Sequence, residues 1–413
     1  MTHVLNDFGA RVLQKRREPR RFFLRKIGFF LILVVFQRVK LLLAPDKFKG
    51  SLPAVAVAEA LARGWQSVLP ADECIFAPVA DGGEGFSEAL AKALGAGWIT
   101  VDSVDALGRP IRARYAWVAA DRTAIVEMSE ASGLWRIAPS DRDPRRANTF
   151  GTGLLMRDAM QRGARRILLG LGGSATTDGG AGMAAALGFR FLAADSGKAL
   201  EPLPCLLPEV GRVDASGVPA LPEMVAACDV QNPLLGPRGT AAVFSPQKGA
   251  DPGTVVFLEE ALAHFARVVE GAFGARCAEV PGAGAAGGIG FGLLAFCGAS
   301  LEPGFDLVAK AMQLERRMAG VDLVLTGEGR LDCQTLEGKG PAGVGAMARA
   351  LGKPVIAFAG SIEEHPGVWA SFDALVPIVD RPVSLEEAMQ NAAPFLERAA
   401  ARTARLLRLS NSL

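Results

Sequence analysis

Charged side chains beside glycine follow several of the apolar runs in this chain. The run LVL at 323–325 continues as TGEGRLD, which places Glu328, Arg330 and Asp332 on a glycine-rich backbone. The turn DGGEG, which begins at Asp81, follows another apolar run. Magnesium favours one or two carboxylates together with phosphate oxygens, and such turns could provide those carboxylates. They predict a polar ligand site, with helix capping and solvated turns as the alternative.

A third glycine-rich turn carries hydroxyl groups as well as an acid. GLGGSATTDGGAGM at 170–183 ends the apolar run RRILLGLG. Ser174, Thr176 and Thr177 can donate hydrogen bonds to anionic oxygens, and Asp178 can accept a hydroxyl proton or bind a metal. The alternative is that these residues only cap the helix that follows.

Two further segments are similar to nucleotide-binding motifs. PGAGAAGGIGFG at 281–292 contains GxGxxG at Gly282, Gly284 and Gly287, which could place backbone amides against phosphate. The preceding RCAEV is a poor strand, so close backbone packing or another phosphate contact is favoured over a nicotinamide site. CQTLEGKG at 333–340 lacks the leading glycine and the final Ser or Thr of a Walker loop. A Walker-type nucleoside triphosphatase is therefore not indicated, and phosphate could still be held by other glycine turns with Lys or Arg.

Strand, polar turn and helix alternate near both ends of the chain. VKLLLAP at 39–45 predicts a buried strand, and AVAVAEALARGWQSV, which follows, predicts a helix. Residues 99–130 alternate polar and apolar side chains around turns, which predicts antiparallel strands. Strands and helices alternate again after about residue 282. This order is typical of an α/β protein whose parallel-sheet domain is interrupted by another domain.

The length also favours two domains, because 413 residues exceed the size at which one hydrophobic core usually stops growing. We expect the first domain at 39–98 and 285–413, and an inserted α/β domain with antiparallel strands at 99–284. Residues 1–38 are expected to be an upstream extension outside the fold. An interfacial anchor or an imperfect signal peptide is the alternative for this extension.

Charge and hydropathy separate the extension from the rest of the chain. Residues 1–40 hold ten Lys and Arg against two acids, which leaves 35 Lys and Arg against 41 Asp and Glu elsewhere. The body therefore has no general excess of positive charge for nucleic acid. The apolar run IGFFLILVVF is too short to cross a bilayer of about 30 Å as a helix. A membrane partner is expected only if the extension is retained.

The six cysteines are scattered without a CxxC pair, and only three histidines are present. Neither a zinc site nor a disulfide framework is indicated, so we expect reduced thiols and a cytoplasmic location. Any divalent metal would need oxygen ligands.

Taken together, the motifs resemble the glycerate kinase family in its bacterial type 1 form. The segments, in order, are LLLAPDKFKGSL, PVADGGEGF, EMSEASGL, GLGGSATTDGGAGM, ACDVQNPLLGPRGTAAVFSPQKGA, PGAGAAGGIG and LVLTGEGRLDCQTLEGKGPAGV. The resemblance covers about 39–400. It implies ATP-dependent phosphorylation of glycerate, usually to 2-phosphoglycerate, by a flavodoxin-like domain with an inserted second domain. Phe150 and Thr177 stand where Tyr and Asn are commoner in that family, and neither change removes a group that is charged at neutral pH.

With that activity as the hypothesis, particular residues receive roles. Asp178 is expected to accept or position the hydroxyl proton of glycerate, with Asp81 as its closest competitor. Glu328 and Asp332 are expected to bind Mg²⁺, directly or through water. The other candidates are Lys49 as a catalytic cation; Asp46, Ser174, Thr177, Asp229, Arg330 and Lys339 at the substrate; and Gly284, Gly287, Gly327, Gly329 and Thr335 at the nucleotide.

Three other functions stay open. They are a kinase of a related small hydroxy acid, a nicotinamide-dependent oxidoreductase built on GAGAAG, and a non-catalytic regulator that binds a metabolite. The sequence does not fix the hydroxyl that is phosphorylated, the enantiomer used or the position of an adenine pocket. It also leaves the oligomeric state open, with a homodimer as one outcome.

Overall fold

Five parallel strands form the first sheet, in the order β14-β13-β12-β1-β2. The computed structural model describes residues 38–410 except 81, 84, 334 and 336–339. The strands of this sheet are β1 (Lys40–Leu43), β2 (Glu73–Phe76), β12 (Leu323–Leu331), β13 (Val355–Ile362) and β14 (Ala374–Pro377). Numbered along the chain, the order is 2-1-3-4-5, which is the flavodoxin-like arrangement. The predicted flavodoxin-like sheet is confirmed.

Both faces of the first sheet are buried, as a parallel sheet requires. Leu41 and Leu43 of β1 belong to the core on one face, and Leu42 belongs to the core on the other. The first face is covered by α2 (Ala54–Gln66) and α15 (Ala392–Ser410). The second face packs against α3 (Phe86–Leu94), α10 (Gly304–Ala311), α11 (Leu314–Ala319) and α12 (Gly340–Ala350).

The second sheet has six strands in the order β11-β10-β6-β5-β4-β3. Its strands are β3 (Gly97–Val104), β4 (Pro110–Val118), β5 (Thr123–Glu127), β6 (Arg166–Gly170), β10 (Glu223–Ala227) and β11 (Ser300–Glu302). The pairs β3–β4 and β4–β5 are antiparallel, which confirms the antiparallel strands predicted over 99–130. The other neighbouring strands of this sheet are parallel.

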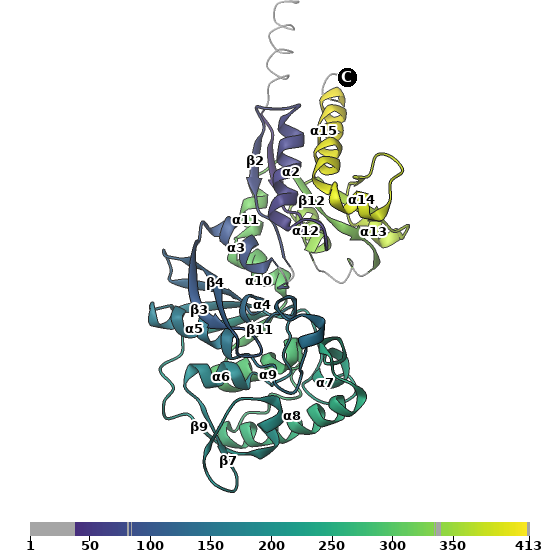
Figure 1. Cartoon of the computed structure of the whole chain (residues 1–413). Helices are drawn as coiled ribbons and strands as arrows, with labels where there is room; N and C mark the ends of the chain where they lie inside the picture. Colours follow the sequence, from purple (N-terminus) through teal and green to yellow (C-terminus); the bar gives the residue numbers. More distant parts are fainter. Residues whose placement is uncertain (1–37, 81, 84, 334, 336–339, 411–413) are drawn as a thin grey trace, which may run out of the picture.

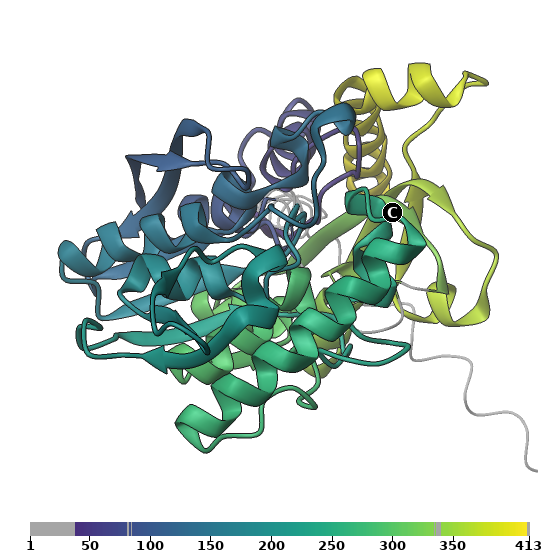
Figure 2. The same ribbon diagram turned by 60° about the horizontal axis from the view of Figure 1, so that its bottom comes forward.

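A small antiparallel sheet and several helices complete the second half of the structure. The small sheet consists of β7 (Arg190–Ala193), β8 (Ala199–Leu200) and β9 (Val210–Asp214). The helices are α4 (Ser129–Ser132), α5 (Phe150–Gln161), α6 (Ala181–Leu187), α7 (Thr240–Phe244), α8 (Pro252–Phe273) and α9 (Ala285–Cys297). Phe191, Phe265 and Phe296 of these elements pack together, with ring centroids 5.3–6.2 Å apart. Figure 2 shows the long helix α8 in the part of the molecule turned towards the viewer.

The two large sheets lie in two lobes, which Figure 1 shows one above the other. We call the part built on the five-stranded sheet the first lobe and the part built on the six-stranded sheet the second lobe. After β2, every strand up to β11 belongs to the second sheet or to the small sheet. The next strand of the first sheet is β12. The expected domain limits at 98 and 284 stay predictions. Over the described residues, 38–410, no helix has both the length and the apolar character needed to cross a bilayer.

Candidate active site at the junction of the lobes

Two cavities meet at the loop that follows β1. The smaller, with a volume of about 410 Å³, lies between the lobes. The larger, of about 630 Å³, lies in the first lobe at the carboxyl ends of its strands. Asp46, Lys47, Phe48, Lys49 and Ser51 line both cavities. The loop 46–51 therefore borders both cavities, and ligands bound in the two cavities would both contact it.

Strand order explains the position of this loop. Strands β1 and β12 are neighbours, but the chain continues from β1 to β2 on one side and from β12 to β13 on the other. Ligands bind in the crevice that forms at such a switch point. The Asp46 amide donates to the Gly327 carbonyl at 2.8 Å, which joins the two strand ends. Phe48, only 3% exposed, anchors the loop, and its amide donates to the Leu52 carbonyl.

Polar side chains gather at one end of the larger cavity. The Thr335 hydroxyl donates to Glu328 Oε1 at 2.7 Å and accepts from the Asp332 amide at 3.1 Å. The exposed Arg330 lies against Asp332, with Nε 3.2 Å from Oδ2. A Cβ on Gly329 would lie 3.4 Å from the Lys49 amide nitrogen, so this glycine lies close to the loop 46–51. The structure thus brings Glu328, Arg330, Asp332 and Thr335 together beside that loop.

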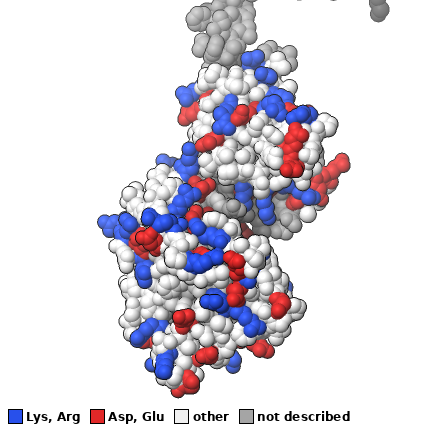
Figure 3. Space-filling model, in the orientation of Figure 1, with Lys and Arg blue, Asp and Glu red and all other residues white. Residues whose placement is uncertain are grey.

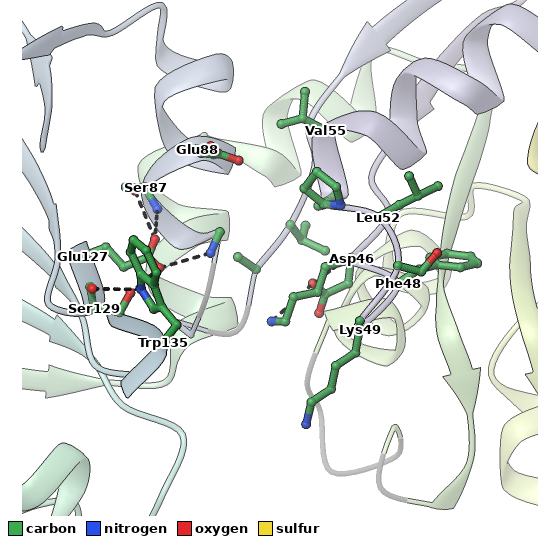
Figure 4. A pocket seen from close by; sticks show the side chains of 18 of the residues that line it. Asp46, Phe48, Lys49, Leu52, Val55, Ser87, Glu88, Glu127, Ser129 and Trp135 are labelled. Carbon is green, nitrogen blue, oxygen red and sulfur yellow. Dashed lines mark hydrogen bonds and ion pairs between the residues drawn. The ribbon is translucent and has the colours of Figure 1, made fainter. Parts of the chain in front are cut away.

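Glu127 faces the loop 46–51 from the second-lobe side of the smaller cavity (Figure 4). Its carboxylate accepts hydrogen bonds from the amides of Gly85 and Ser87 and from the hydroxyls of Ser87 and Ser129. Burial raises the pKa of Glu127, and these donors oppose the shift. Gly85 and Ser87 lie at the start of α3. Their hydrogen bonds to Glu127 therefore connect the end of β5 to a helix between the two sheets.

Asp178 lies in the buried interior of the second lobe and lines neither of these two cavities. Its carboxylate accepts from the Thr149 hydroxyl at 2.7 Å and from the Thr149 amide at 2.8 Å. It also accepts from the amides of Gly180 and Gly182. Burial raises the pKa of Asp178, and these donors oppose the shift. The contacts are those of a helix cap shared by the starts of α5 and α6.

The glycines of the GxGxxG segment pack against backbone in the second lobe. A Cβ on Gly287 would lie 1.8 Å from the Thr176 carbonyl oxygen, and a Cβ on Gly284 would lie 2.2 Å from the Pro233 carbonyl oxygen. The Gly287 carbonyl accepts from the Gly179 amide. Residues 276–280, which precede the segment, contain no strand.

Lys248 is buried beside this packed region. Its ammonium donates to the Ser174 hydroxyl at 2.8 Å and to the Thr176 carbonyl at 2.6 Å. Burial lowers the pKa of Lys248 to about 7, and the charge of Asp178 opposes the shift. Ser174 and Thr177 are likewise buried, and they line neither of the two junction cavities.

Three other candidates take separate positions. Asp229 Oδ1 accepts from the Gly304 amide at 2.9 Å, so it holds the start of α10. Gly327 lies within β12 opposite Phe358 of β13, and a Cβ there would lie 2.0 Å from the Phe358 carbonyl oxygen. Asp81 and Lys339 lie outside the described residues. The functional roles predicted for all these residues stay predictions.

A family model described as the glycerate kinase family matches residues 41–408. The chain belongs to the glycerate kinase family. The resemblance predicted from the motifs is thereby confirmed, and so is the prediction that the chain is a kinase.

Relatives agree over nearly their whole length. A glycerate kinase of Bacillus subtilis is 42% identical over 91% of this chain and 99% of its own. A glycerate 2-kinase of Escherichia coli is 40% identical over 89% of this chain and 98% of its own. A solved structure from Salmonella typhimurium LT2, described as a candidate glycerate kinase 2, is 39% identical, with a TM-score of 0.83. That structural match covers 91% of this chain and 100% of the solved chain.

The junction also contains residues that the sequence analysis did not single out. Glu127 and the 66%-exposed Trp135 line the smaller cavity. Glu127 ends the apolar strand TAIVE, which is the pattern that pointed to Glu328. Lys47 lies between Asp46 and Lys49 in the motif DKFKGS. An acid that ends a buried strand was therefore a usable signal, even without glycine beside it.

The described acids offer hard oxygen ligands near the polar end of the larger cavity. Asp332, Cys333 and Glu363 bring one ligand atom each within 4.8 Å of one another. Glu328 lies beside them through its hydrogen bond to Thr335, whose hydroxyl fixes the orientation of the carboxylate. Carboxylate oxygens are ligands that suit Mg²⁺.

Figure 3 shows Lys and Arg interspersed with Asp and Glu over the coloured part of one face of both lobes.

Proposed function

We propose that the chain transfers the γ-phosphate of ATP to the 2-hydroxyl of glycerate, giving 2-phosphoglycerate and ADP. The observation that carries this proposal is the meeting of two cavities at the loop 46–51. The larger cavity holds the triphosphate at its polar end, and the smaller holds glycerate between the lobes. The name of the Escherichia coli relative, a glycerate 2-kinase, favours the 2-hydroxyl.

The reaction needs in-line alignment and neutralised charge more than covalent participation of the protein. The hydroxyl oxygen of glycerate forms a bond to the γ-phosphorus. The bond from that phosphorus to the β–γ bridging oxygen breaks, and ADP leaves with the electron pair. Lys47 and Lys49 line both cavities, so their ammonium groups are suited to offset the negative charge where the two ligands meet.

Asp46 is the acid that we propose for the hydroxyl proton. It lines both cavities, whereas Asp178 lines neither and already accepts four hydrogen bonds. Asp46 is only 7% exposed, and its Oδ1 accepts from the Lys47 amide at 2.6 Å. This bond fixes the carboxylate so that it can orient the hydroxyl and receive its proton. Asp178 and Asp81 remain the acids favoured by the sequence.

The polar end of the larger cavity is proposed to hold Mg²⁺ through Glu328 and Asp332. The ion would supply positive charge to phosphate oxygens that the two carboxylates alone would repel. Arg330 and Lys339 are retained as proposed contacts to anionic oxygens, because both are cations and the guanidinium of Arg330 can bind such groups in a bidentate manner. A cytoplasmic location is proposed from the cysteine pattern.

Phosphorus NMR of the product tests the function directly. The full chain is supplied with D-glycerate, ATP and Mg²⁺. Phosphate on the 2-oxygen couples to one proton and gives a doublet, whereas phosphate on the 3-oxygen couples to two and gives a triplet. A doublet is expected, and a triplet would reassign the acceptor hydroxyl. Absence of product from glycerate, with turnover of another small hydroxy acid, would favour the related-acid kinase.

A further inference from the structure

The larger cavity differs in character between its two ends. One end contains the charged and hydroxyl-bearing residues Glu328, Arg330, Asp332 and Thr335. The other is lined by the apolar side chains of Phe48, Ile378, Val379, Leu385, Ala388, Met389 and Ala392. Glycerate and phosphate have no apolar surface large enough to require such a wall. An apolar group of a ligand would be suited to this end.

Helix α14 (Leu385–Gln390) supplies one side of the apolar end. Leu385, Ala388 and Met389 are spaced three and four residues apart, so they lie on one face of the helix. Glu387, on another face, pairs with Arg381 at 2.9 Å. Leu385 is 77% exposed although it lines the cavity. The helix thus presents a leucine to the cavity with most of its surface still uncovered.

The apolar end is connected to the loop that joins the two cavities. The Ser51 hydroxyl donates to the Met389 carbonyl. A Cβ on Gly50 would lie 3.0 Å from the Met389 methyl carbon, so the loop packs against the same side chain. Phe48 is the buried anchor of the loop and also lines the apolar end. A ligand there would contact the residues that fix the position of Asp46 and Lys49.

We propose that the apolar end of the larger cavity binds the adenine base of ATP, between Leu385 and Met389 of α14 and Ile378 and Val379 after β14. This inference rests on the proposed function, because the phosphates of the same nucleotide occupy the polar end. The base is the one part of either reactant with large apolar faces. The volume of about 630 Å³ lies within the range of pockets that enclose small ligands, roughly 300–1,000 Å³.

Binding of three separate probes tests the inference on the full chain. Calorimetry measures the affinities for ATP, for adenosine and for inorganic tripolyphosphate. Leu385→Ser and Met389→Ser are each expected to weaken ATP and adenosine binding about tenfold and to leave tripolyphosphate binding unchanged. Arg330→Ala is expected to weaken ATP and tripolyphosphate binding and to leave adenosine binding unchanged.

Leu406→Ser is the matched control, because this leucine of α15 is 67% exposed and does not line the cavity. It should leave all three affinities unchanged. Unchanged ATP and adenosine binding in both α14 variants would overturn the inference. So would a change from dimer to monomer in Leu385→Ser without any loss of adenosine affinity, because a second copy would then cover this face.

The two proposals can fail separately. If the chain phosphorylates glycerate from ATP but the α14 variants bind ATP normally, the base site is wrong and the proposed function stands. If adenosine binding depends on Leu385 but glycerate is never phosphorylated, the base site stands and the acceptor is wrong.

Discussion

Glycine-rich turns with acidic residues occur in both lobes, but they have opposite surroundings. In the first lobe, the loop 46–51 lines both junction cavities, and Glu328, Arg330 and Asp332 line the larger one. In the second lobe, the turns at 172–180 and 281–288 pack against each other, and Asp178 and Lys248 are buried beside them. The same residue types thus line cavities in one lobe and form a polar core in the other.

The space around each glycine shows the difference. A Cβ on Gly287 would overlap a backbone carbonyl, at 1.8 Å, whereas a Cβ on Gly329 would lie 3.4 Å from its nearest neighbour. In the second lobe, glycine permits contact between two backbones. In the first lobe, Gly327 of β12 is packed in the same way against Phe358, whereas Gly329 lies beside the larger cavity and the loop 46–51. Glycine beside an acid therefore indicates close approach, but does not say whether the partner is a ligand or the protein itself.

The largest expected effect is on stability, and it compares these two glycines. Gly287→Ala should lower the free energy of unfolding by about 4 kcal/mol, because it adds overpacking of about 1–3 kcal/mol to a left-handed backbone costing about 1–2 kcal/mol. The backbone φ of Gly287 is 81°. Gly329→Ala should lower stability by less than about 1 kcal/mol, since its Cβ has space. Urea unfolding followed by circular dichroism measures both, and equal losses would remove the distinction.

A smaller effect is expected when the acids of the two lobes are compared. Asp46→Asn should lower kcat at least about a hundredfold, since an acid that accepts the proton contributes about 10²–10⁴-fold. Asp178→Asn should lower kcat less than about tenfold. It should instead lower the free energy of unfolding by about 1–2 kcal/mol, because the NH2 group of Asn cannot accept the hydrogen bond of a buried backbone amide. Coupled ADP detection and thermal unfolding of both variants measure the two effects.

The outcome decides between the two acids. A hundredfold loss of kcat in Asp178→Asn, with unchanged unfolding, would return the proton-accepting role to Asp178. Near-normal kcat in Asp46→Asn would remove Asp46 from the mechanism.

The smallest expected effect is the pH dependence caused by Lys248. Its pKa of about 7 in the folded chain lies below its ordinary value of 10.5. At a pH between these two pKa values, Lys248 is protonated in the unfolded chain and neutral in the folded chain. The free energy of unfolding should therefore rise with pH, by about 2 kcal/mol from pH 7 to pH 9. Urea unfolding at pH 7, 8 and 9 measures this rise.

Two lysine variants provide the comparison for this pH effect. Lys248→Met should lose the rise, because the buried ammonium is gone. Lys92→Met should keep it, since the Lys92 side chain is 49% exposed and pairs with Glu59 at the surface. A rise of equal size in Lys248→Met would assign the pH dependence to other groups.

Local pattern was enough for most of the fold. Apolar runs such as LLLAP at 41–45 and LVL at 323–325 predicted buried strands that the structure contains, as β1 and β12. Alternation over 99–130 predicted the antiparallel strands β3 to β5. These predictions depend on neighbouring residues only. The sequence did not predict that β11 belongs to the second sheet, so that the first sheet resumes only at β12. The reason is that β11 is three residues long and pairs with β10, which is distant in the chain.

The sequence by itself determined the strands, the glycine-rich turns, the family and the chemical types available to the site. It could do so because apolar periodicity and local motifs are properties of short segments. Only the tertiary structure decided which turns meet. Strand order brings Asp46 of one end of the chain beside Glu328 of the other, whereas backbone packing encloses Asp178 among its donors. Such pairings depend on contacts between residues far apart in the chain, which spacing along the sequence does not encode.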